Sequence, residues 1–430
     1  MICPMTAPHP VGSSQPAPAR ALRRAQLLLD SLGPLQTPQV RIYLGGQTVS
    51  LVGTWLQATA QAWVIWELSH STTALAIASL LGLGPSLLIG PLAGVWADRL
   101  DRRRLLIVVQ LVAAATACSL ALLAQTRMLQ LWQVDVLILV LGVDATLGGP
   151  AERALLTDLV GAERAREAVA LNQVIFQLSR ILGPVLAGII VVGLGPAVAF
   201  WLNGLSFLAV AGSLLVIHPR QVLAPAGSSS ARALGEALRF IAATPPVLEL
   251  FVLGFLLTFL ALPVMTVLPA VVDRVLHGGP GTLGVLTAAS AAGALAGAVV
   301  LLPFVRSLSR PGIIVGAAVI WTGIWFVVFS QSAWLPLSIL CMLLIGLAGP
   351  SVMALATGVL QVVAPLDMRA RIQSLFSTIT YGAQPVGVLL LGFSADRIGA
   401  STGILACGGL IALGAVLVLL ARPDLRRWTV

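Results

Sequence analysis

Residues 73–104 read TALAIASLLGLGPSLLIGPLAGVWADRLDRRR, an apolar run that ends in a compact group of charges. Such a run matches the ~20 residues that a helix needs to cross ~30 Å of hydrocarbon. Its polar and apolar residues do not alternate, so it is not typical of a strand in a membrane barrel. The segment therefore predicts a transmembrane helix followed by a short charged turn.

Similar runs fill the rest of the chain. Hydrophobic residues make up 58% of the 430 positions and charged residues only 10%, whereas about a quarter of a soluble protein is charged. We therefore expect an all-α membrane protein with twelve transmembrane helices. The expected spans are 42–66, 73–97, 104–125, 131–151, 168–193, 196–217, 248–272, 282–304, 312–331, 333–353, 372–394 and 401–421.

The distribution of basic residues predicts the orientation. All 25 of them are arginines. With the N-terminus inside, 21 lie on the inner side, 3 lie in outer loops, and Arg180 lies within a span. Positive loops stay on the cytoplasmic side, so we expect a multi-pass inner-membrane protein with both termini cytoplasmic. Because the arginines are scattered over short loops, the net charge of +9 does not indicate a nucleic-acid partner.

Weak internal repetition indicates two related halves. Ala74-Leu75-Ala76 opens the second span, and Thr282-Leu283-Gly284 opens the eighth span 208 residues later. A polar stretch that includes ARALGEALRFIA separates the halves and predicts a cytoplasmic linker with one surface helix. The expected parts are a partly disordered cytoplasmic tail (1–40), a first six-helix bundle (41–217), the linker (218–247), a second six-helix bundle (248–421) and a cytoplasmic C-terminal tail (422–430).

The charged turn after the second span carries the most specific motif. Residues 94–104 (GVWADRLDRRR) resemble the inner-loop signature G-x-x-x-D-R-x-G-R-R of the major facilitator superfamily, with Asp101 at the glycine before the last two arginines. The resemblance implies a gating loop made by Gly94, Asp98, Arg99, Arg102 and Arg103. The simpler alternative is that these charges only set the topology.

The fifth and sixth spans narrow the resemblance. Their sequences AVALNQVIFQLSRILGPVLAGII and FWLNGLSFLAV are similar to the enterobactin-exporter-like branch, which implies the major facilitator fold of two pseudo-symmetric six-helix bundles and an efflux function. Gly183, Pro184 and Gly188 resemble part of an antiporter motif. A glycine-lined helix contact with a proline kink would give the same residues. Arg153 is displaced by one position from the family pattern, so no function is assigned to it.

Polar side chains recur at helical spacing on spans from both halves. Amides that face lipid are costly, so we expect these side chains to face a central, water-accessible cavity. Hydrogen bonding between helices is an equally good explanation for any single glutamine. The candidate substrate-cavity residues are Gln57, Gln61, Asn172, Gln177, Arg180, Tyr381 and Gln384.

Arg180 lies near the middle of its span, where an arginine costs about 2.5–3.5 kcal/mol on insertion scales and needs a partner. Asp144, on the preceding antiparallel span, falls at a similar depth. We therefore expect Asp144 and Arg180 to approach each other. The pair is either a proton-coupling site, in which Asp144 binds the proton, or a permanent ion pair.

These features together predict a secondary active transporter that works by alternating access. The expected activity is proton-coupled export of a small amphipathic molecule of drug or siderophore type, by a monomer. The chain has no Lys for a phosphate-binding loop, and its His and Cys residues lack metal-site spacing, so we expect neither cofactor nor metal. An importer or uniporter of the same fold is the alternative, and a membrane scaffold or an intramembrane enzyme fits less well.

Overall fold

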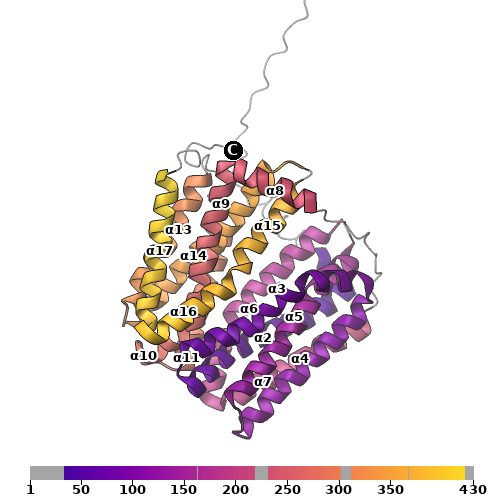
Figure 1. Cartoon of the computed structure of the whole chain (residues 1–430). Coiled ribbons are helices and arrows are strands. Elements are labelled where there is room, and N and C mark those ends of the chain that lie inside the picture. Colours follow the sequence, from indigo (N-terminus) through magenta and orange to yellow (C-terminus); the bar gives the residue numbers. More distant parts are fainter. Residues whose placement is uncertain (1–32, 162, 218–230, 302–310, 367, 422–430) are drawn as a thin grey trace, which may run out of the picture.

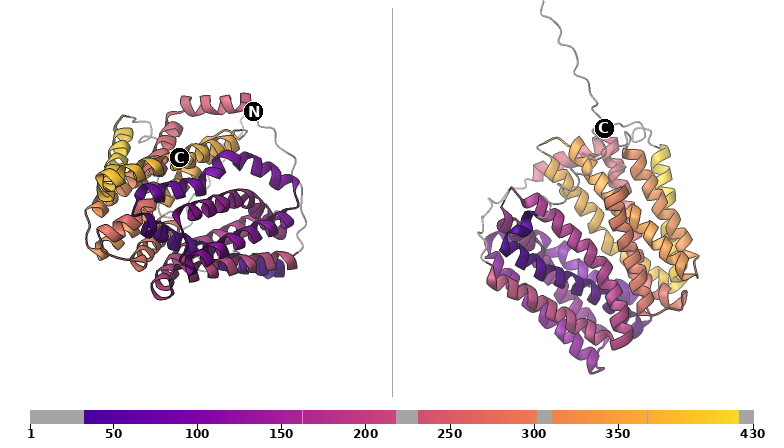
Figure 2. Two further views of the ribbon diagram at one scale, coloured as in Figure 1. Left: turned by 60° about the horizontal axis from the view of Figure 1, so that its bottom comes forward. Right: turned by 180° about the vertical axis from the view of Figure 1, so that it is seen from behind.

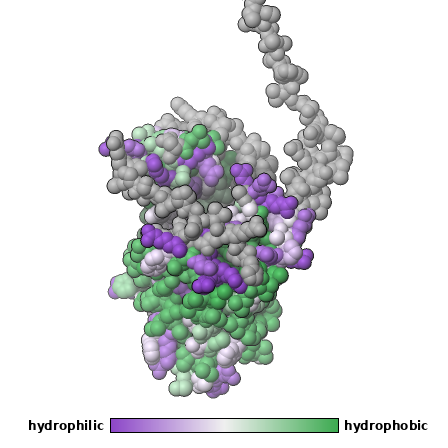
Figure 3. All heavy atoms as spheres, turned by 90° about the vertical axis from the view of Figure 1, so that its right-hand side faces the viewer, coloured by the Kyte–Doolittle hydropathy of each residue, from purple (hydrophilic) through white to green (hydrophobic). Residues whose placement is uncertain are grey.

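The structure is a computed structural model that describes residues 33–161, 163–217, 231–301, 311–366 and 368–421. Residues 1–32 of the expected N-terminal tail (1–40), the expected C-terminal tail (422–430) and residues 218–230 of the linker lie outside the described residues. Figure 1 shows a bundle of long helices. In the view of Figure 3, hydrophobic side chains form a broad belt below a group of hydrophilic ones, as a bilayer requires.

The first half consists of six long helices joined by short turns. They are α2 (Pro38–Ser69), α3 (Thr72–Arg99), α4 (Arg102–Gln125), α5 (Leu131–Val160), α6 (Ala165–Leu194) and α7 (Pro196–Val216). The turns use residues suited to a sharp reversal. Gly195, with φ of 85°, ends α6, and Pro196 starts α7, because glycine tolerates positive φ and proline suits the first helical turn.

The second half repeats this plan with interrupted helices. It contains α9 (Pro245–Leu256), the π-helical turn η2 (Leu257–Ala261), α10 (Leu262–Arg274), α11 (Pro280–Ala296), the π-helical turn η3 (Gly297–Leu301), α13 (Pro311–Ser330), α14 (Leu335–Val363), α15 (Arg369–Gly382), α16 (Gln384–Ile398) and α17 (Ala400–Ala421). α9, η2 and α10 form one continuous rod, and α15 and α16 form another that is broken at Ala383.

Eleven of these rods are long and apolar enough to cross a membrane. The twelfth is α2, which has 32 residues but carries a stripe of polar side chains. The described residues therefore contain the twelve long helices expected from the sequence. Within the described part of the expected linker lies one helix, α8 (Ala231–Ala243), which precedes α9 and buries Ala237 and Ile241.

The two halves lie side by side and are inclined to each other (Figures 1 and 2). They pack through α6 against α11 and through α3 against α16. The hydrogen bonds between described residues of the two halves gather near His70, Asp273 and Asp396. These residues lie at the end of the molecule opposite the α3–α4 turn. We call the end with the α3–α4 turn the basic end, after its arginines.

Candidate functional site

The α3–α4 turn ties the helices of the first half together at the basic end. The Arg104 amide donates a 3.0 Å hydrogen bond to Oδ1 of Asp101, so Asp101 caps the start of α4. Aspartate is among the residues preferred at this position. The residue that departs from the superfamily signature therefore has a structural role of its own.

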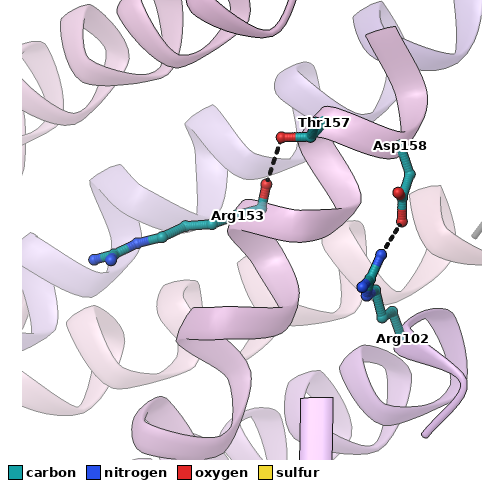
Figure 4. Close-up of polar contacts among 4 residues, drawn as sticks. All are labelled: Arg102, Arg153, Thr157 and Asp158. Atoms are coloured by element: carbon teal, nitrogen blue, oxygen red, sulfur yellow. Dashed lines mark hydrogen bonds and ion pairs between the residues drawn. The ribbon is translucent and has the colours of Figure 1, made fainter. Parts of the chain in front are cut away.

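Arg102 and Arg103 extend from this turn to two other helices. Arg102 forms a 2.7 Å ion pair with Asp158 of α5, and both side chains are less than 10% exposed (Figure 4). Arg103 donates 2.6 Å hydrogen bonds to the carbonyl oxygens of Leu214 and Leu215, at the C-terminal end of α7. A cation is favourable there because the last carbonyls of a helix lack partners.

The remaining motif residues are less informative. The surroundings of Gly94 and of the Asp98 side chain lie outside what the structure describes, and Arg99 is exposed at the end of α3. Arg153 points away from the Arg102–Asp158 pair in Figure 4. The described contacts therefore support a structural role for the turn within the first half, and its gating role stays a prediction.

The antiporter-like motif lies where α6 packs on its neighbours. A Cβ atom at Gly183 would lie 2.8 Å from the backbone nitrogen of Leu56 in α2, and one at Gly188 would lie 2.9 Å from Cα of Gly281 in α11. The carbonyl oxygen of Pro184 occupies the space that a side chain at Gly284 would need. In this conformation the motif residues lie where α6 packs closely against α2 of the same half and α11 of the other half.

Arg180 and Asp144 do not form the ion pair that the sequence suggested. The Arg180 guanidinium lies 5.2 Å from the ring centroid of Trp55, and its Nη1 donates a 3.3 Å hydrogen bond to Gln177. Phe176 packs edge-on against the same indole at 5.8 Å. Arg180 turns toward α2, whereas Asp144 is 9% exposed inside the first half. A similar depth on adjacent helices is therefore not enough to bring these two side chains together.

Asp144 shares its surroundings with a carboxyl group that the sequence analysis did not single out. Glu152 lies two helical turns further along α5, within electrostatic reach of Asp144. Nε2 of Gln110 in α4 lies 3.5 Å from its Oε1, and Gln47 of α2 approaches the same carboxyl group. Buried Tyr43 lies nearby. These side chains form a polar cluster between α2, α4 and α5.

Gln57 and Gln61 are buried inside the first half. Nδ2 of Asn203 in α7 donates a 2.8 Å hydrogen bond to Gln57, and Gln57 in turn lies 3.4 Å from Oε1 of Gln61. Ser206 also donates to Asn203, over 2.9 Å. These contacts match the alternative of hydrogen bonding between helices. The expected opening of Gln57 and Gln61 to a central cavity is not what this conformation shows.

The other candidate cavity residues are more accessible. Asn172, Gln177 and Gln384 are half-buried, and Tyr381 is 50% exposed. Tyr381 and Gln384 flank the break between α15 and α16 in the second half. Accessible polar side chains therefore lie in two places, on α6 around Arg180 and at the break between α15 and α16. Among the described residues, no group of His, Cys, Asp and Glu could hold a metal ion.

Comparison with known proteins agrees with this architecture. The model of the family described as "Transmembrane secretion effector" matches residues 29–429. The chain is 26% identical over 382 residues to the macrolide efflux protein A of Streptococcus pyogenes, covering 86% of this chain and 93% of that protein. It is 28% identical over 414 residues to the enterobactin exporter EntS of Citrobacter koseri, covering 94% and 96%.

The multidrug efflux pump Tap of Mycolicibacterium fortuitum is 26% identical over 382 residues, which cover 86% of this chain and 92% of the pump. Among solved structures, a bacterial homologue of the lysosomal transporter Spinster in an inward-facing conformation aligns with a TM-score of 0.68. The alignment has 14% sequence identity and covers 91% of this chain and 97% of the homologue. This similarity establishes the fold.

Proposed function

Because the chain belongs to the transmembrane secretion effector family within the major facilitator superfamily, we propose that it exports a small amphipathic organic molecule by proton-coupled alternating access. The substrate class is of drug or siderophore type, in keeping with relatives named for macrolide, multidrug and enterobactin export. The protein acts as a monomer in the inner membrane, with the basic end and both termini on the cytoplasmic side. The gathering of arginines at one end supports this orientation.

The single observation that carries the substrate class is the group around Arg180 on α6. A guanidinium over the ring of Trp55 presents a cation, an aromatic side chain and the neighbouring amide of Gln177 together. Binding sites of this kind combine apolar area with a few placed polar groups. Such a surface suits a molecule with an aromatic or apolar body and an anionic or polar substituent.

The proton site in this proposal is the carboxyl pair of α5. Asp144 and Glu152 lie two helical turns apart on α5, inside the first half. Ionisable side chains within a membrane span are candidates for a proton pathway. Arg180 enters the coupling by moving toward Asp144 in another conformation, since it lies against Trp55 here.

Proteoliposomes that contain the purified chain test this function. With an acidic interior, we expect vesicles in the inside-out orientation to accumulate labelled macrolide or labelled enterobactin, and a protonophore should abolish the accumulation. Accumulation only with the opposite gradient would indicate import. Uptake that ignores the gradient and stops at equal concentrations on the two sides would indicate a uniporter. Absence of both accumulation and counterflow, across a broad panel of compounds, would contradict transport itself.

Two variants separate coupling from binding. Asp144→Asn and Glu152→Gln remove one ionisable group each and keep a similar shape, and Asp135→Asn near the opposite end of α5 is the matched control. We expect the first two to lose gradient-driven accumulation but to keep counterflow, which needs only substrate binding and conformational exchange. Full gradient-driven accumulation by both variants would remove the carboxyl pair from the coupling role.

A further inference from the structure

The end opposite the basic end holds a carboxylate that bridges the two halves. Asp396, near the C-terminal end of α16, meets the first residues of α3. Its Oδ2 accepts hydrogen bonds from Oγ of Ser71 at 2.6 Å and from the amide of Thr73 at 2.9 Å. Its Oδ1 accepts from the amide of Thr72 at 2.7 Å. Both oxygens of one carboxylate are therefore engaged by the other half of the molecule.

The Thr72 hydroxyl completes the contact. It lies 2.8 Å from Oδ1 of Asp396 and 2.6 Å from the carbonyl oxygen of Gly392, one turn earlier on α16. A hydroxyl has one proton to donate, so the two acceptors share it. Thr72 is fully buried, and a Cβ atom at Gly392 would lie 2.7 Å from its carbonyl oxygen. The backbones of α3 and α16 thus approach as closely as a glycine permits.

The start of α3 has a local cap besides this carboxylate. Ser71 already caps the helix, because its Oγ accepts a 3.2 Å hydrogen bond from the Ala74 amide. Asp396 adds a second, tertiary acceptor at a helix N-terminus, where negative charge is stabilised by the free amides and the helix dipole. Its contribution is therefore to the position of one half relative to the other.

A second bridge lies at the same end. Nε1 of Trp66 donates a 3.0 Å hydrogen bond to Asp273, and Arg274 donates a 2.8 Å hydrogen bond to the carbonyl oxygen of His70. The Arg274 guanidinium also lies 4.7 Å from the ring centroid of Trp66. The residues from α2 and the α2–α3 turn thus contact the end of α10, while Asp396 holds α3 to α16.

From this geometry we infer that Asp396 is a releasable latch, which holds the end opposite the basic end closed and opens once in each transport cycle. The inference rests on the proposed alternating access, because only a protein that opens at both ends must break these contacts. The latch selects one of two arrangements of the halves, and its loss shifts the population between them.

The exposure of the Asp396 side chain distinguishes the latch from an ion pair that stays formed throughout the cycle. Asp396 is exposed at the surface, so water can replace the donors of α3 when the halves separate, and the net cost of release is small. The Arg102–Asp158 pair is the opposite case. Its side chains are 6% and 8% exposed. Because both belong to the first half, a movement of one half relative to the other leaves this ion pair intact.

Spin-label distances test the latch without substrate or gradient. The background variant has its four cysteines replaced, and one label pair sits on exposed Met128 and Gln331, in the two halves at the latch end. A second pair on exposed Arg166 and Leu366 reports on the basic end. The distance within each label pair is measured in lipid nanodiscs by pulsed electron–electron double resonance.

We expect Asp396→Ala to lower the ratio of latch-closed to latch-open molecules by at least tenfold, with longer distances at the latch end and shorter ones at the basic end. Asp396→Asn should act in the same direction, because its amide NH₂ group would face a backbone N–H or a hydroxyl donor. Ser394→Ala is the control, since among the described residues Ser394 donates its hydrogen bond to the carbonyl oxygen of Leu391 in its own helix.

Unchanged distances in well-folded Asp396→Ala protein would overturn the latch, and so would an equal shift in the Ser394→Ala control. Elution as a single symmetric peak in gel filtration establishes that each variant is folded. Because the distances need no transported compound, failure of every transport assay would reject the proposed function and leave the latch supported or refuted on its own data.

Discussion

The crossing of α13 and α17 allows a stability prediction with an internal control. Gly408 and Gly409 are consecutive residues of α17. A Cβ atom at Gly408 would lie 2.8 Å from the carbonyl oxygen of Gly323 and 2.9 Å from the backbone nitrogen of Val327, both in α13. A Cβ atom at Gly409 would meet no described atom within 4 Å. Small residues at such crossings let two helix backbones approach closely.

The magnitude follows from two opposing effects. Alanine is favoured over glycine in a helix by about 1 kcal/mol, and this gain applies to Gly408→Ala and Gly409→Ala alike. Overpacking costs about 1–3 kcal/mol and applies only at Gly408, where the obstructing atoms are backbone and cannot rotate away. We therefore expect Gly408→Ala to be less stable than Gly409→Ala by about 1–3 kcal/mol, with Gly409→Ala at or above the parent chain.

The assay is equilibrium unfolding of the purified protein in bicelles by increasing mole fraction of a denaturing detergent. The comparison between the two variants cancels the helix-propensity effect and leaves the steric one. Equal free energies of unfolding for the two variants, or a more stable Gly408→Ala variant, would refute the packing of α13 on α17 described above.

Three further predictions concern polar contacts. Asp158→Asn should lower the free energy of unfolding by about 3 kcal/mol, because breaking a buried ion pair costs ~3–5 kcal/mol. Arg104→Gln at the exposed surface should change this free energy little, and the same bicelle titration measures both variants. Arg180→Lys keeps the charge but replaces the planar guanidinium that lies over the Trp55 ring with a compact ammonium group. The KM for transported substrate should therefore rise several-fold in proteoliposomes while the melting temperature stays unchanged. Asn203→Leu should destabilise the first half by about 1–3 kcal/mol, because it leaves buried Gln57 without its donor, and Asn203→Ser should recover part of that loss in thermal unfolding.

The positions of the helices could be predicted because hydropathy and loop charge report on the bilayer, which surrounds every span alike. The fourth span shows where this fails. It was expected to end at 151, where charges begin, but α5 continues to Val160. Glu152 and Asp158 are accommodated inside by Gln110 and Arg102 of α4. A charged residue marks a helix end only when no neighbour can pair with it.

The candidate site was less predictable, because periodicity shows which residues share a helix face but not what that face meets. Gln57 and Gln61 lie on one face as expected, yet that face meets Asn203 of α7 within the same half. The charge and depth of Arg180 predict Asp144 as its partner, but its neighbour is the ring of Trp55. Choosing between such partners requires the rotation of each helix about its axis, which the sequence does not specify.

The polar stripe of α2 has a consequence for how the chain enters the membrane during synthesis. Asn203, which satisfies the buried amide of Gln57, lies 146 residues further along the chain. At ~5–20 residues per second, a ribosome needs about 7–30 s to add those residues. During that interval an amide of the first helix has no partner from α7, and lipid offers none. We therefore expect the first helix to stay in a hydrated, protein-lined setting until α7 emerges, and the first half to enter the bilayer as a group of helices rather than one at a time.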